Sequence, residues 1–288
     1  MSRRAASWLI ASCLGCAAAA AGAHQQATFS SRVEAVRVDV LVSDRGVPVR
    51  GLGTADFEVW DNGVPQQVEL VSFEQLPLRV VLALDMSDSV VGKRLANLRS
   101  ASLALLEALK AGDEAALITF NEAVSLRAAS TGEFAGVRAA LERVDPSGST
   151  STIDASFAAL TLGESGVGRG LVILFSDGLD TSSWLQQDDV LDIAKRCDAV
   201  AYAVSTTRAS DDHFLRALTD QTGGRRMSVE TTKDIGAAFL EMLNEFRQRY
   251  VVSYTPTGVA REGWHRLTVR VRNRNVTVRA RPGYLAQF

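Results

Sequence analysis

Two uninterrupted apolar segments, residues 80–84 and 171–175, place the strongest constraint on the fold of this chain. A strand that is apolar at every position is buried on both faces, as in a parallel sheet that is covered by helices. The first segment is followed by a helical stripe of leucines between residues 95 and 109, and Gly112 marks the end of that helix. Strand and helix patterns then alternate as far as residue 249. The sequence therefore predicts an α/β fold, with a Rossmann-like, doubly wound, mostly parallel sheet over residues 78–249.

The other elements of this region are expected from the same two periodicities. The expected strands are 115–120, 200–204 and 123–128, the last as a hairpin edge, and the expected helices are 134–144, 153–162, 190–197, 214–218 and one with an apolar stripe of Ile235, Phe239, Met242 and Phe246. In a sheet of this kind, ligands bind beyond the carboxyl ends of the strands, so a site is expected in the loops there.

The segments on either side, residues 33–74 and 250–288, have strand patterns and no helical period. Valines at every second position from Val36 to Val42 indicate a half-buried strand, and Asp61-Asn62-Gly63 predicts a hairpin turn between strands 57–60 and 64–70. Further strands are expected at 250–254, 267–271 and 276–280. Because each flank has too few strands to bury a core alone, we expect the two flanks to form one β-rich module into which residues 78–249 are inserted.

Residues 1–23 have the features of an export signal. Arg3 and Arg4 precede an uncharged segment that ends in the small residues Ala21-Gly22-Ala23. The sequence predicts cleavage there and a periplasmic or extracellular location, with a retained membrane anchor as the alternative. Residues 10–13 (Ile-Ala-Ser-Cys) have the shape of a lipobox, so acylation at Cys13 stays open. Contact with a membrane is expected only if that cysteine is lipidated.

Charge and composition argue against several other classes of function. The formal net charge of −2 provides no field that would draw the chain to nucleic acid or to a membrane. Seven arginines lie between residues 261 and 281, but Arg270 and Arg272 alternate with Leu267, Val269 and Val271, so the arginines are expected to form the solvated face of a strand. No aromatic residues interleave with them to stack bases, so no nucleic-acid partner is expected. The chain has three histidines and no His-Glu-x-x-His motif, which argues against a zinc enzyme.

Cys197 is the single cysteine outside the predicted signal, so it cannot form a disulfide within the mature chain. It is expected to share a helical face with Val190, Ile193 and Ala194. This pattern predicts a small buried side chain and not a nucleophile.

Short oxygen-bearing side chains follow the first apolar strand directly, in the sequence Asp85-Met86-Ser87-Asp88-Ser89. A carboxylate and two hydroxyls at positions i, i+2 and i+4 converge when the loop curls around one point, and hard cations prefer such oxygen ligands. Thr150 lies just before an expected helix, and Asp177 follows the second apolar strand. Each of these features alone is more often a helix cap or a turn. Together they lie in loops at one edge of the predicted sheet, so they can meet in space.

This order of motifs resembles the metal-ion-dependent adhesion site of von Willebrand factor A (VWFA) domains, and the resemblance extends over residues 78–249. It implies the VWA fold and one divalent cation, Mg²⁺ or Mn²⁺, whose ligands are Asp85, Ser87, Ser89, Thr150 and Asp177. The flanks, at residues 47–52, 55–59, 250–254 and 281–284, are similar to those of exported, acidobacterial-type VWFA-related proteins. Asp88 departs from the family, which usually has glycine there, and this leaves open whether it tightens the loop or disturbs its backbone.

The resemblance implies a non-enzymatic adhesion or interaction module, in which the ion captures an Asp or Glu carboxylate of a protein partner. A metal-dependent hydrolase or phosphatase is the alternative, and it would require a general base near the open coordination position. Asp88 and Asp180 are the spare carboxylates nearby in the sequence. A third interpretation makes the ion a purely structural link between the loops. Loss of partner binding with retained stability after chelation would separate the first interpretation from the third.

Overall fold

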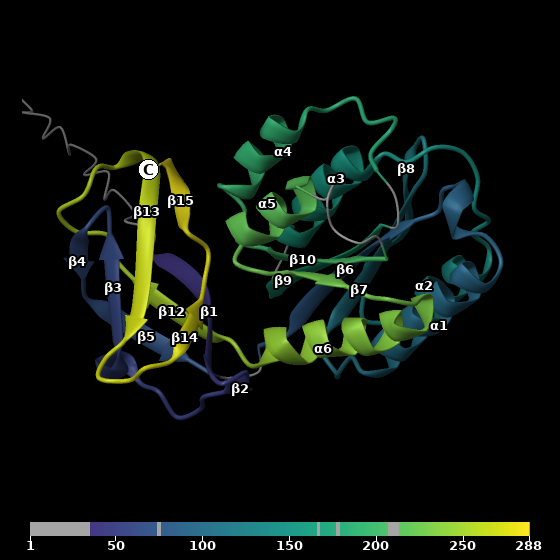
Figure 1. Cartoon of the computed structure of the whole chain (residues 1–288). Coiled ribbons are helices and arrows are strands. Elements are labelled where there is room, and N and C mark those ends of the chain that lie inside the picture. The colour runs from purple at the N-terminus through teal and green to yellow at the C-terminus, as the bar shows by residue number, and fades with distance from the viewer. Residues whose placement is uncertain (1–34, 74–75, 166–167, 177–178, 207–212, 288) are drawn as a thin grey trace, which may run out of the picture. The chain divides into compact units, whose positions relative to one another are not determined.

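The sheet within residues 78–249 has the predicted doubly wound, mostly parallel topology (Figure 1). The computed structural model describes residues 35–73, 76–165, 168–176, 179–206 and 213–287, so the predicted signal peptide, residues 1–23, lies outside the described residues. The strand order is β11-β10-β9-β6-β7-β8, and neighbours are parallel except for the edge strand β8, which is antiparallel to β7 as expected. The strands are β6 (Leu78–Asp85), β7 (Glu114–Phe120), β8 (Val124–Thr131), β9 (Arg169–Ser176), β10 (Val200–Ser205) and β11 (Arg226–Ser228).

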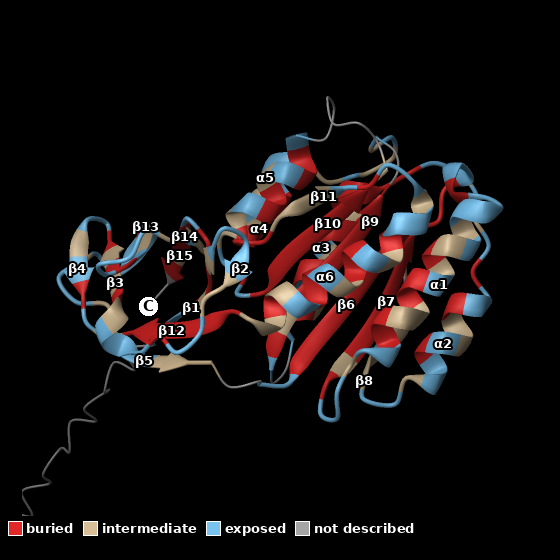
Figure 2. Ribbon diagram, turned by 60° about the horizontal axis from the view of Figure 1, so that its bottom comes forward, coloured by how far each residue is buried: buried red, intermediate tan, exposed pale blue. Residues whose placement is uncertain are grey.

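Helices cover both faces of this sheet because alternate residues of each strand point to opposite faces. Val80, Leu82 and Leu84 of β6 pack with α1, α2 and α6, whereas Val81 and Ala83 pack with α3, α4 and α5 (Figure 2). Within the described residues, no helix is long and apolar enough to cross a membrane. The α-helices are α1 (Lys93–Glu107), α2 (Ala135–Glu142), α3 (Thr152–Glu164), α4 (Gln187–Ala194), α5 (His213–Gln221) and α6 (Ile235–Arg247), and the short 3₁₀ helices are η1 (Thr54–Asp56), η2 (Asp88–Val90) and η3 (Thr232–Asp234).

Strands from the two flanks build two antiparallel sheets, and we call residues 35–73 and 250–287 the β module. One sheet has the order β14-β1-β12-β5, with β2 beside β1, and the other has the order β15-β13-β3-β4. The C-terminal strand β12 lies between the N-terminal strands β1 and β5, and β13 pairs with β3, so the expected β-rich module of both flanks is confirmed. Its strands are β1 (Val36–Asp44), β2 (Val47–Pro48), β3 (Phe57–Asp61), β4 (Val64–Gln66), β5 (Val68–Ser72), β12 (Tyr250–Tyr254), β13 (Glu262–Val271), β14 (Thr277–Arg279) and β15 (Gly283–Gln287).

The predicted strand at residues 64–70 is wrong in one respect, because it is two strands in different sheets. β4 stays beside β3, as the hairpin signal predicts, whereas β5 crosses to the other sheet and pairs with β12. Gln66 is buried where the two strands meet, and the backbone of Thr257 holds its amide. Gln66 Nε2 donates to Thr257 O at 3.0 Å, and Thr257 N donates to Gln66 Oε1 at 2.9 Å. A contact with a residue so distant in the sequence leaves no local signal.

The helix expected at residues 190–197 is α4, which begins and ends earlier in the chain. Its start is fixed by Asp189, whose carboxylate accepts the Gln186 N–H at 3.2 Å. Cys197 therefore lies beyond the helix and not on its apolar face, which corrects the prediction. It is nevertheless buried, and burial, followed by the nearby Glu164 carboxylate, raises the pKa of its thiol well above the usual range. A protonated, buried thiol is inert, in agreement with the predicted structural role.

Buried arginines join the β module to the α/β region. Arg249 lies between α6 and β12, where its Nη2 donates to Gly223 O at 2.7 Å and its Nε donates to Tyr202 Oη at 3.1 Å. Arg169 begins β9 and donates from Nε to Asp39 Oδ1 of β1 at 2.9 Å. Charge-assisted hydrogen bonds therefore connect the two parts beside the point where the chain itself crosses.

The tail arginines divide into two groups. Arg266 and Arg270 are exposed on β13, and Arg272 is exposed directly after it, as the predicted solvated strand face requires. Arg281 is buried, and its Nη1 donates to Asp198 Oδ1 at 2.7 Å, while Arg279 Nη1 donates to Gly224 O at 3.1 Å. The prediction is thus wrong for Arg279 and Arg281, because the end of the β module packs on the segments that flank β10.

Candidate metal centre

Asp85 is the last residue of β6, and its carboxylate is fully buried at the carboxyl edge of the sheet. The backbone N–H of Ser87 donates to Oδ1 at 2.9 Å, and the hydroxyl of Ser176 donates to Oδ2 at 3.0 Å. Ser176 ends the neighbouring strand β9 and lies 3.3 Å from Thr152 Oγ1 at the start of α3. Both carboxylate oxygens are therefore oriented by residues that leave the sheet at the same edge.

The two serines of the Asp-x-Ser-x-Ser motif lie together beyond β6. Ser87 Oγ and Ser89 Oγ are 2.9 Å apart, with Ser87 buried and Ser89 exposed. The 3₁₀ helix η2 provides the curl of the loop, since Val90 N donates to Ser87 O at 3.0 Å. This turn places the hydroxyls of Ser87 and Ser89 side by side.

The loop that carries Thr150 is attached directly to the Asp85 loop. Asp88 N donates to Gly148 O at 3.0 Å, and Ser147 N donates to Met86 O at 2.9 Å. Thr150 follows two residues after Gly148, and its side chain is largely buried, with 6% of the residue exposed. The structure thus brings the loops of Asp85, Ser87, Ser89 and Thr150 to one edge. Asp177 lies outside the described residues, directly after Ser176 at the end of β9.

Asp88, which stands where the related family usually has glycine, occupies the first position of η2 and is exposed. Among the described residues, the non-glycine positions with positive φ are Arg45, Asn62 and Asn273, so the backbone at Asp88 does not need glycine. Asp88 therefore does not disturb the backbone of this loop, because its conformation is open to any residue without strain.

Asp154 and Asp180 are anchors that the sequence did not distinguish. Asp154 in the first turn of α3 accepts the backbone N–H groups of Trp184 at 3.0 Å and Leu185 at 2.9 Å. Asp180 Oδ2 accepts the Ile153 N–H at 3.0 Å and the Ser183 hydroxyl at 2.5 Å. Asp180 was a candidate general base, but these bonds commit its carboxylate to the start of α3. Acidic residues near Ser and Thr in the sequence indicated such capping, but the sequence did not indicate which backbone groups they would bind.

The oxygen donors fit a hard cation. The hydroxyls of Ser87 and Ser89 lie 2.9 Å apart in a hydrogen bond with each other, so both oxygens are within reach of one ion. In the part of the chain that the structure describes, no group of three or more His, Cys, Asp or Glu side chains could hold a metal, so a cation here depends on hydroxyl oxygens.

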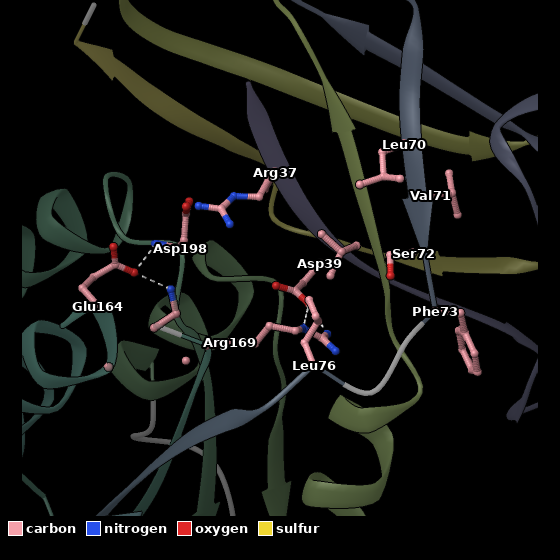
Figure 3. Close-up of a pocket in the computed structure, with 15 residues that line it drawn as sticks. Arg37, Asp39, Leu70, Val71, Ser72, Phe73, Leu76, Glu164, Arg169 and Asp198 are labelled. Carbon is pink, nitrogen blue, oxygen red and sulfur yellow. Dashed lines mark hydrogen bonds and ion pairs between the residues drawn. The ribbon is translucent and has the colours of Figure 1, made fainter. Parts of the chain in front are cut away.

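A cavity of about 540 Å³ lies at the opposite edge of the sheet, where β9 begins beside β1 and β5 (Figure 3). Arg169 pairs with Asp39 there, and Glu164 Oε1 accepts the Ala199 N–H at 2.8 Å. Arg37 points toward Asp198 across the cavity (Figure 3). Most of the charged side chains that line the cavity thus face a group of opposite charge, and the cavity is separate from the loops at the carboxyl edge.

The fold and this loop cluster define a class of doubly wound α/β domains with oxygen side chains at the carboxyl edge of the sheet. Comparison with known families identifies the class, because the sequence profile of the von Willebrand factor type A domain matches residues 80–179. That range runs from β6 to the segment after β9 and includes every predicted ligand position. Residues 80–179 match the von Willebrand factor type A domain family, and we refer to residues 78–249 as the A domain.

Solved structures agree with this assignment at the level of the fold. Proximal thread matrix protein 1 from the mussel byssus, described with a zinc-occupied MIDAS motif, has a TM-score of 0.54 at 12% identity, over 63% of this chain and 48% of that one. A mutant of the PilB minor pilin from Streptococcus sanguinis has a TM-score of 0.50 at 12% identity, over 61% and 62% of the two chains.

This chain spans less than two thirds of the mussel and streptococcal proteins. The comparison with curated proteins gave no match. Domains of this family typically mediate protein–protein interactions, and they often bind a divalent metal at a MIDAS, the metal-ion-dependent adhesion site.

Proposed function

We propose that the A domain binds a protein partner through a divalent cation, Mg²⁺ or Mn²⁺, which captures an Asp or Glu carboxylate of that partner. The ligands are Asp85, Ser87, Ser89, Thr150 and Asp177. The observation that carries the proposal is the pair of serine hydroxyls 2.9 Å apart beside the buried, oriented carboxylate of Asp85. Asp177 remains a ligand on the strength of the sequence alone.

The composition of this ligand set favours capture of an acidic group. Three of the five ligands are neutral hydroxyls, so the ion keeps more positive character than it would have in a cage of carboxylates. Mg²⁺ takes six oxygen ligands, which leaves at least one position for water or for a partner's carboxylate. A binding partner that supplies a carboxylate would complete both the coordination and the charge.

The residues around the site support binding over hydrolysis. Asp180 is held by the start of α3, and the two histidines within the described residues lie elsewhere, His213 at the start of α5 and His265 buried in the β module. The remaining candidate base, Asp88, is exposed and lies beside the hydroxyl ligands without a histidine to orient. We therefore propose a non-enzymatic module.

The same contacts argue against a purely structural ion. The Asp85 and Thr150 loops are joined by Asp88 N to Gly148 O and by Ser147 N to Met86 O, and these bonds need no metal. The Thr150 loop is joined in turn to the segment after β9, since Thr181 N donates to Thr150 O at 2.8 Å. Chelation should therefore abolish partner binding and leave the fold in place.

We also propose that the protein is exported, to the periplasm or the cell exterior. The support is the sequence of residues 1–23 and the similarity of the flanks to exported VWFA-related proteins. N-terminal sequencing of the mature protein tests this proposal. A start at His24 is expected, and an acylated Cys13 would instead show a membrane-anchored form.

Selection of displayed peptides tests the binding function without a known partner. The full chain in Mg²⁺ should select peptides that contain Asp or Glu from a random library and that EDTA releases. Replacement of the selected acid by Asn or Gln should abolish binding, and Asp85→Ala should select no such peptides. Binding that persists in EDTA, or peptides without an acid, would overturn the mechanism.

A further inference from the structure

Trp184 is the most exposed of the large hydrophobic residues in the described part of the chain, with 89% of its surface accessible. It lies in the segment between β9 and α4. An exposed aromatic side chain can serve as a binding anchor only if its backbone is held in place, so the backbone contacts of Trp184 decide whether it can do so.

The backbone N–H groups of Trp184 and Leu185 are both held by Asp154 at the start of α3. The Trp184 N–H donates to Asp154 Oδ2 at 3.0 Å, and the Leu185 N–H donates to Asp154 Oδ1 at 2.9 Å. The side chain of Leu185 packs against the hydrophobic core under α3 and α4. Leu185 therefore anchors the segment to the core, while the neighbouring Trp184 exposes its indole to solvent.

The segment that carries Trp184 is bonded to the Thr150 loop of the proposed metal centre. Ser182 N donates to Thr150 O at 3.1 Å. The two residues from Ser182 to Trp184 span at most about 7 Å, so the Trp184 backbone lies within roughly 10 Å of the Thr150 carbonyl. The loops of the site carry two more exposed apolar side chains, Val91 (57%) and Leu179 (56%). An apolar rim thus adjoins the oxygen ligands.

We propose that Trp184 is the apolar anchor of the partner-binding face, and that the partner presents an apolar side chain two to four residues from the acid that the ion captures. This inference rests on the proposed function. An extended peptide advances about 3.3 Å per residue, so the upper limit of roughly 10 Å corresponds to about three positions, which lies within the range of two to four. Tryptophan is enriched among the residues that dominate binding energy, and a pre-ordered indole binds with little loss of conformational freedom.

The charges near Trp184 favour a protein segment over a lipid surface. Asp188 and Asp189 begin α4 and are exposed, and Asp88 is exposed beside the metal ligands. Anionic lipid headgroups would be repelled by these carboxylates. A partner's single carboxylate is different, because the cation binds it directly.

The test compares peptide selection by the wild-type chain, Trp184→Ala and Leu126→Ala, each in Mg²⁺ and in EDTA. Leu126 is the matched control, since it is 57% exposed on β8 and is not part of the loops around the site. Wild type and Leu126→Ala should select peptides with an acid and an apolar residue two to four positions apart. Trp184→Ala should select acids without this apolar preference, and should bind the wild-type peptides about tenfold more weakly or worse.

Two further measurements make the outcomes distinct. The Mg²⁺ affinity of Trp184→Ala should equal that of wild type, because the indole contacts no ligand. Acidic, Mg²⁺-dependent peptides with no apolar preference in wild type would overturn the role of Trp184 and leave the metal mechanism intact. Absence of any Mg²⁺-dependent peptide would overturn the proposed function itself. Binding of wild type, but not Trp184→Ala, to phosphatidylcholine–phosphatidylserine vesicles would instead assign the indole to a membrane surface and refute the proposal.

Discussion

The Asp61 carboxylate joins the two sheets of the β module, and its removal should strongly destabilise that module. Asp61 is fully buried at the end of β3. Its oxygens accept hydrogen bonds from Tyr284 Oη at 2.8 Å and from Tyr254 Oη at 2.9 Å, and they lie 2.7 Å from His265 Nδ1. Tyr254 belongs to the opposite sheet. Burial, followed by the effects of Tyr284 and Asp61, raises the pKa of Tyr254, so its hydroxyl stays protonated and donates.

The magnitude follows from the groups that Asp61→Ala would leave without a partner. Two buried hydroxyls lose their acceptor and the imidazole loses its contact, and each unsatisfied buried group costs about 1–3 kcal/mol. The expected loss for the three groups is about 3–9 kcal/mol, a large part of the 5–15 kcal/mol (roughly) that stabilises a typical domain. Asp61→Asn keeps one carbonyl acceptor and should lose about half as much.

Urea denaturation followed by circular dichroism measures this loss. Glu58→Ala is the control in the same strand, because its ion pair with Arg272 is solvent-exposed, at 3.3 Å, and such pairs contribute less than about 1 kcal/mol. A free energy of unfolding for Asp61→Ala within about 1 kcal/mol of wild type would refute the argument that this carboxylate joins the sheets.

Three further predictions concern the connections within the chain. Deletion of residues 250–288 should remove protease protection from residues 35–73, because β12 and β13 supply their strand partners; surviving protection would contradict a shared module. Hydrogen exchange across α6 should slow when Mg²⁺ and a selected peptide bind, since α6 leads into β12, and identical rates would exclude this route. Hydrogen bonds from Arg79 and then Ser130 lower the pKa of Glu114. Its stabilising contribution is therefore present above the ordinary carboxyl pKa and lost as the pH falls through the lowered value, and Glu114→Gln should show a shallower loss in melting temperature on acidification.

The sequence predicted the parts of the fold that depend on local pattern. Every residue of β6 is buried, which is why its apolar run has no alternation and why a parallel, helix-covered sheet could be inferred. The position of Asp85 followed from the same pattern, because the end of a parallel strand fixes which edge its next residues occupy. The placement of Ser87 and Ser89 in the loop beyond β6 then followed from their spacing after Asp85.

The features that the sequence did not predict depend on contacts between distant residues. β5 leaves the hairpin where Gln66 meets Thr257, and Arg281 is buried where it meets Asp198. A periodic pattern records how often a side chain faces the core, but it does not record which element lies opposite. For the same reason Asp180 resembled a spare carboxylate until its bond to the Ile153 N–H was seen.

If Asp85 and its neighbouring hydroxyls hold a divalent cation, calorimetric titration with Mg²⁺ should detect its binding. Asp85→Asn removes the charge of a buried ligand, whereas the control Asp88→Asn removes a charge from an exposed neighbour in the same loop. Wild type should bind one Mg²⁺, Asp85→Asn should bind it at least about tenfold more weakly, and Asp88→Asn should stay within about threefold of wild type. Thr150→Ala, which removes one neutral oxygen, should fall between them. An unchanged Mg²⁺ affinity in folded Asp85→Asn would show that the Asp85 carboxylate does not hold the ion.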